Sequence, residues 1–74
     1  MNLSMALEGK RCMVIKINLS DKTKKRFNEL GLYEGVEIKV TKKRKNAFLI
    51  LDILGVFYAI RDKDAKNIMV ECYE

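Results

Sequence analysis

Apolar and polar residues alternate in short runs over most of the chain, a two-residue period typical of β-strands with one buried face. We predict strands at residues 11–17, 36–43, 47–54, 56–60 and 68–72. A single helical segment falls between the first two. Five short strands with one early helix favour a mainly β fold, a small and strongly bent antiparallel barrel in which the first and last strands meet.

The alternation also predicts which side chains of the first two strands share a face. In the first strand, Met13, Ile15 and Ile17 are expected on one face, opposite Cys12 and Val14. In the second strand, the side chains expected to point inward are Val36, Ile38 and Val40.

The helix is predicted at about residues 21–30. Ser20 is a good N-cap, because its hydroxyl can accept a hydrogen bond from a backbone N–H in the first turn. Phe27 and Leu30 are spaced i and i+3, so we expect them to form one narrow apolar stripe that packs inward.

The end of this helix and the turn after it are the most informative segment. With Leu30 as the C-cap, Gly31 takes the left-handed conformation and Leu32 folds back on Phe27, as in a Schellman ending. Gly35 then marks the turn into the second strand. We interpret this segment as a joint that holds the fold together.

Length and composition indicate one small globular domain, residues 1–74, because 49% of the residues are apolar. The N-terminus lacks the pattern of a signal peptide. The most apolar stretch, residues 47–60, is shorter than the roughly 20 residues that a membrane helix needs. We therefore expect a cytoplasmic protein.

No catalytic residue is predicted, and we expect a non-enzymatic protein without a cofactor. The chain has no histidine, which excludes Ser–His and Cys–His pairs. Cys12 and Cys72 become neighbours if the barrel closes, and we interpret them as reduced, partly buried thiols. A soft-metal site is the weaker alternative, because no two ligand residues have short spacing.

The net charge is +5, and much of it lies in two basic runs. The second run is residues 42–45, and the first contains Lys22, Lys24, Lys25 and Arg26. Such a run is either a solvated face or a contact surface for an acidic protein or the inner membrane leaflet. Nucleic acid is disfavoured, because only Tyr33 and Phe48 are aromatic platforms near these runs.

The predicted third strand is apolar on both faces, and its second face continues into the next strand around Gly55. The side chains concerned are Phe48, Ile50, Leu54 and Phe57. Two interpretations stay open. Either the helix or the N-terminal arm covers these residues, or they are exposed and form a site for protein binding or self-association.

Three groups of residues resemble the FeoA family (ferrous iron transport protein A). The first and most specific is Arg26, Leu30, Gly31, Leu32 and Gly35; the second is Gly55 with Tyr58-Ala59-Ile60-Arg61; the third is Asp64-Ala65, Ile68 and Val70-Glu71. Glu8 stands where family members often have proline. The outward face of strands three and four is often charged in the family but apolar here.

This resemblance covers about residues 3–71 and implies an SH3-like barrel in which Arg26, Gly55 and the other signature residues are structural. It also implies an accessory role in bacterial ferrous iron uptake, with the cytosolic GTP-binding part of the membrane transporter FeoB as partner and the inner face of the membrane as location. Iron handling is implied without an evident metal site. From the residues themselves, we expect partner contacts in two places: the first basic run on one side, and the four apolar residues of strands three and four on another. A small nucleic-acid-binding barrel is the alternative function.

Overall fold

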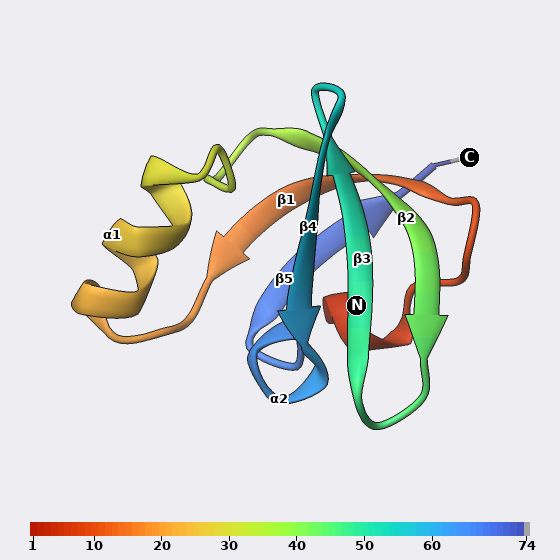
Figure 1. Ribbon diagram of the computed structural model, residues 1–74. Coiled ribbons are helices and arrows are strands. Elements are labelled where there is room, and N and C mark those ends of the chain that lie inside the picture. The colour runs from red at the N-terminus through yellow and green to blue at the C-terminus, as the bar shows by residue number, and fades with distance from the viewer. Residues whose placement is uncertain (74) are drawn as a thin grey trace.

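The computed structural model describes residues 1–73, which form one antiparallel five-stranded sheet with a helix at its side (Figure 1). The strands are β1 (Arg11–Ile17), β2 (Glu37–Arg44), β3 (Phe48–Ile53), β4 (Val56–Arg61) and β5 (Ile68–Cys72). The helices are the 3₁₀ turn η1 (Leu3–Met5), α1 (Asp21–Glu29) and α2 (Asp62–Ala65). The five predicted strands and the predicted helix are confirmed to within one residue at each end.

The strand order is β4-β3-β2-β1-β5, so the first and last strands are neighbours, as predicted. The sheet curves strongly, and α2 connects its two edge strands, β4 and β5 (Figure 1). The outer edge of β5 is covered by the N-terminal residues: Val70 N–H donates to the Met1 carbonyl over 2.8 Å, and Asn2 forms a β-bridge with Met69. This edge is therefore protected from further strand pairing.

The apolar core fills the concave side of the sheet. Leu49 and Leu51 of β3 are fully buried, and Ile38 and Val40 of β2 are buried as predicted, together with Val36 just before β2. These side chains occupy every second position along the chain, which puts them on the same face of the sheet.

The predicted faces of β1 were partly wrong. Val14 and Ile17 are both buried, whereas Met13 and Ile15 are 42% and 49% exposed. The pairing of β1 with β5 shifts register between Val14 and Lys16, which adds one residue to β1 at that point. This bulge returns Ile17 to the core side, where a regular strand would have placed it with Ile15.

Helix α1 begins and ends as the sequence predicts. The Ser20 hydroxyl accepts a hydrogen bond from Thr23 N–H at 3.3 Å. At the other end, Leu32 N–H donates to the Phe27 carbonyl over 2.9 Å, and Gly31, with a φ of 97°, donates to the Asn28 carbonyl over 3.1 Å. These two bonds define the Schellman ending.

Leu30 does not pack inward, contrary to the prediction. The buried residue of α1 is Phe27, while Leu30 is the C-cap and is 44% exposed. Because the chain reverses at Gly31, Leu32 takes the buried position beside Phe27 in place of Leu30.

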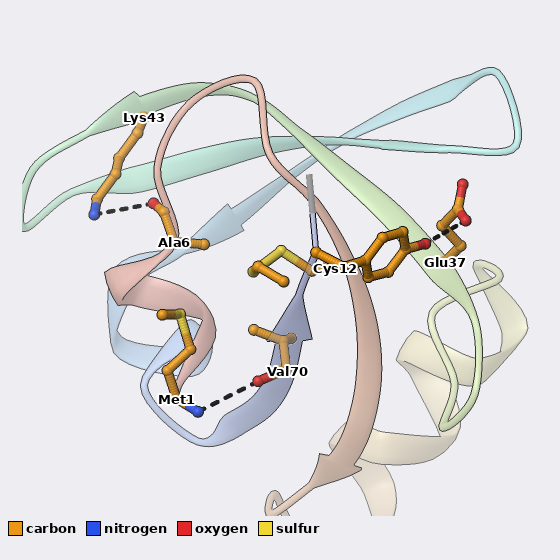
Figure 2. Close-up of a disulfide and its surroundings, with 8 residues drawn as sticks. Met1, Ala6, Cys12, Glu37, Lys43 and Val70 are labelled. Atoms are coloured by element: carbon orange, nitrogen blue, oxygen red, sulfur yellow. Dashed lines mark hydrogen bonds between the residues drawn. A yellow bond between two sulfur atoms is a disulfide. The ribbon is translucent and has the colours of Figure 1, made fainter.

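The two cysteines form a disulfide, so the interpretation as reduced thiols was wrong (Figure 2). Cys12 of β1 and Cys72 of β5 are directly paired across the two strands, and their Cα atoms are 3.9 Å apart. The sequence predicted their proximity, but it gave no register that would place one thiol opposite the other.

Candidate partner-binding surface

The β3–β4 hairpin carries Leu54, the most exposed of the large apolar side chains in the described residues. We call Phe48, Ile50, Leu54 and Phe57 the hairpin surface. Leu54 is 82% exposed and Phe57 is 63% exposed, whereas Phe48 and Ile50 are half-buried. The question left open by the sequence is therefore settled for Leu54 and Phe57, which neither α1 nor the N-terminal arm covers.

Strand register puts three side chains of the hairpin surface, Phe48, Ile50 and Phe57, on one face. Ile50 is opposite Ala59, and Phe57 is opposite Asp52, two residues further along β3 from Ile50. Phe57 and Ile50 are thus diagonal neighbours on the outer face. Phe48 lies on the same face, opposite Arg61, at the end of the hairpin that is farthest from the turn.

The turn at the tip of the hairpin has an unusual residue. Ile53 pairs with Val56, and the two residues between them, Leu54 and Gly55, have φ angles of 52° and 90°. Two positive φ angles define a type I′ turn, which prefers asparagine or aspartate at the position of Leu54. A left-handed conformation costs a residue such as leucine on the order of 1–2 kcal/mol. The Asp52 carboxylate supports the turn by accepting a hydrogen bond from Gly55 N–H at 2.9 Å.

Val56 belongs to this exposed tip, although the sequence did not single it out. Its position in the alternation places it with Tyr58 and the buried Ile60, yet Val56 is 50% exposed. The hairpin extends beyond the neighbouring strands at its turn (Figure 1), so an inward-facing residue there has no core beneath it. In the sequence, the sign of this exposure was that Val56 directly follows the turn residue Gly55.

The first basic run lies on α1, to one side of the sheet and away from the hairpin turn (Figure 1). Lys22, Lys25 and Arg26 are exposed. Lys24 instead forms an ion pair with Glu34, with 3.2 Å between its Nζ and Oε2. The Arg26 guanidinium also lies over the Phe27 ring, 5.7 Å from the ring centre. The structure thus does not join the basic run and the hairpin surface into one cluster.

A small apolar groove of about 40 Å³ separates the two regions. Its walls come from the end of α1 and from the β3–β4 hairpin, and its lining residues are Phe27, Leu30, Leu32, Leu51, Ile53, Tyr58, Ala59 and Ile60. Leu30, which was expected in the core, therefore lines a surface groove. The sequence had no signal for this groove, because it depends on where α1 sits against the sheet.

Glu34 fastens α1 to the end of β1. Its Oε2 accepts hydrogen bonds from Ile17 N–H and from Lys24 Nζ, both at 3.2 Å. The backbone hydrogen bond from Ile17, followed by the hydrogen bond and charge of Lys24, lowers the pKa of Glu34 below the ordinary value for a glutamate.

The second basic run is partly used inside the fold. Lys43 N–H donates to the Glu8 carboxylate over 2.7 Å, and Lys43 Nζ donates to the Ala6 carbonyl over 3.2 Å (Figure 2). Glu8 thus helps to hold the N-terminal arm against β2. Lys43 is half-buried, so this run is a mixed segment rather than a uniform basic face.

Two negative findings apply to the described part of the chain, residues 1–73. No three histidine, cysteine, aspartate or glutamate side chains there are grouped so that they could hold a metal ion. No helix there is both long and apolar enough to cross a membrane.

A small, strongly curved antiparallel sheet of five strands with one flanking helix defines an SH3-like domain. The FeoA domain family matches residues 1–72, and the chain belongs to this family. The family is not a known enzyme family and is associated with ferrous iron uptake. No curated protein matches the chain.

Solved structures agree with this assignment. The crystal structure of an iron uptake regulatory protein (FeoA) has a TM-score of 0.90 and 25% identity, over 99% of this chain and 97% of that one. The FeoA-like protein of Clostridium acetobutylicum has a TM-score of 0.82 and 25% identity, over 97% and 85% of the two chains. The FeoA protein of Chlorobium tepidum, at 23% identity, shares the fold with a TM-score of 0.87, over 100% of this chain and 71% of that one.

Proposed function

We propose that this protein is a non-enzymatic accessory protein of bacterial ferrous iron uptake. In this proposal it acts in the cytoplasm, at the inner face of the membrane, and binds the cytosolic GTP-binding region of a FeoB-type transporter. Membership of the FeoA family supports the role in iron uptake. The observation that carries the binding role is the hairpin surface, in which Leu54 of the two-residue turn and Phe57 of β4 are both exposed.

The hairpin surface suits a protein partner for an energetic reason. Leu54 occupies a backbone conformation that disfavours leucine, and its side chain gains almost no burial in the isolated fold. Strained residues of this kind cluster at functional sites. Burying Leu54 or Phe57 in a partner pocket would contribute roughly 1.5–3 kcal/mol each, which offsets the conformational cost.

The basic face of α1 provides a second, separate contact. Lys22, Lys25 and Arg26 are exposed on it. Each contributes about 1 kcal/mol when it lies near an anionic lipid surface. Since α1 and the hairpin turn lie apart, one face can approach the membrane while the hairpin surface meets the transporter.

The test compares two substitutions at equally exposed apolar residues. Phe57→Asp should weaken binding to the purified cytosolic region of the transporter at least tenfold in a calorimetric titration, because it places a charge in an apolar contact. Leu7→Asp is the matched control, since Leu7 is also 63% exposed but lies in the N-terminal arm. It should bind like the unmodified protein.

Equal affinities for the two variants, with both folded by circular dichroism, would refute the hairpin surface as the binding site. The alternative function has its own readout. Sub-micromolar binding of a labelled oligonucleotide that weakens steeply with salt would indicate a nucleic-acid-binding barrel instead.

A further inference from the structure

The disulfide joins two sulfur atoms in different surroundings. The chain has only two cysteines, and Cys12 is fully buried in the core. Cys72 is half-buried and is the last residue of β5. A thiol from solution can therefore reach the sulfur of Cys72 more easily than the sulfur of Cys12.

An open groove of about 540 Å³ leads to Cys72 and not to Cys12. Its other lining residues are Met1, Met5, Ala6, Leu7, Lys10 and Tyr73. A volume of this size is in the range of sites for small organic molecules. Lys10 is the charged side chain among these residues, so the groove favours a thiol that carries a carboxylate.

From this geometry we propose that Cys72 is a thiol–disulfide exchange site for a low-molecular-weight thiol carrying a carboxylate, with buried Cys12 as the internal exchange partner. The thiolate of the small molecule attacks Cys72 Sγ. The bond between the two Sγ atoms breaks, and Cys12 leaves as a thiolate that takes a proton from water. In the reverse step the Cys12 thiolate attacks Cys72 Sγ and expels the small thiol.

Contacts beside the disulfide keep β5 in place during this exchange. Tyr73 N–H donates to the Arg11 carbonyl over 3.0 Å, and the Tyr73 hydroxyl is hydrogen-bonded to the Glu37 carboxylate (Figure 2). The ladder between β1 and β5 continues from Cys72 to Ile68. The mixed disulfide can thus form on the folded protein, with β5 still paired to β1.

The experiment uses the full unmodified chain and reduced glutathione as the probe. The native protein is incubated with glutathione, and the reaction is stopped by acid. It is then unfolded in excess N-ethylmaleimide, so that buried Cys12 can be alkylated, and digested for mass spectrometry. We expect the glutathionyl group on Cys72 and the maleimide on Cys12. A glutathionyl group on Cys12, or exchange that occurs only in denaturant, would overturn the proposal.

Variants test access and charge separately. After reaction with oxidised glutathione, Cys12→Ser should accumulate the adduct on Cys72, and Cys72→Ser should stay unmodified while folded. Lys10→Glu should slow the reaction with glutathione severalfold but not that with neutral 2-mercaptoethanol. Lys63→Glu, on α2 and with the same change in net charge, is the control. Equal slowing in both lysine variants would overturn the role of Lys10, and modification of folded Cys72→Ser would overturn the assignment of the site.

Discussion

The two sides of the sheet, β1–β5 and β3–β4, are stabilised by different contacts. At the β1–β5 end, backbone pairing, a disulfide and the N-terminal residues along the outer edge all act on the same strand. At the β3–β4 end, a two-residue turn with a leucine in a left-handed conformation leaves Leu54 and Phe57 exposed. The comparison shows that the stabilising contacts gather on one side of this small sheet, and that the β3–β4 hairpin on the other side presents exposed apolar side chains.

The largest expected effect comes from reducing the disulfide. Cys12 and Cys72 are 60 residues apart, and a crosslink over that separation stabilises a fold by about 4 kcal/mol through the unfolded state. Urea unfolding with and without a reductant should show a loss of this size. A loss below about 1 kcal/mol would mean that backbone pairing alone holds the β1–β5 end, and the contrast between the two ends would largely disappear.

A smaller effect of opposite sign is expected at the hairpin turn. Leu54→Asn places a residue suited to the type I′ turn and should raise the free energy of unfolding by about 1 kcal/mol. The same change should weaken transporter binding, since it removes an apolar contact. Urea unfolding and calorimetry of one variant would thus separate the two properties. A loss of stability would show that the Leu54 side chain supports the fold.

The smallest effect concerns Glu34, which ties α1 to the end of β1. Because the pKa of Glu34 is lowered in the folded protein, its contribution to stability is complete above the ordinary pKa of a glutamate. The contribution is lost as the pH falls through the lowered value. The stability difference between the native protein and Glu34→Gln, measured by urea unfolding, should therefore shrink on acidification. A difference that does not change with pH would assign the effect to packing.

Local signals in the sequence were sufficient for the elements of the fold. Alternation placed the strands, and Ser20 and Gly31 marked the two ends of α1, since caps and turn residues act within a few positions. The prediction for the face of Ile17 was wrong because of the bulge in β1. The bulge depends on pairing between β1 and β5, which are far apart in the sequence. Leu30 was misplaced because helical periodicity was extended to the C-cap residue, although Gly31 already marked the reversal of the chain directly after it.

The candidate site was only partly predictable for the same reason. The sequence identified the four residues of the hairpin surface but not their exposure, which depends on where α1 and the N-terminal arm lie. It brought Cys12 and Cys72 near each other but did not fix their register, and the disulfide followed from direct pairing across the strands.

The bond between Cys12 and Cys72 closes the residues between them into a covalent ring. A protease cut at the Leu54-Gly55 turn therefore opens the ring without releasing a fragment. The two pieces of the cut chain stay covalently joined until a reductant breaks the disulfide. New chain ends for split or circularly permuted versions are thus best introduced at this exposed turn.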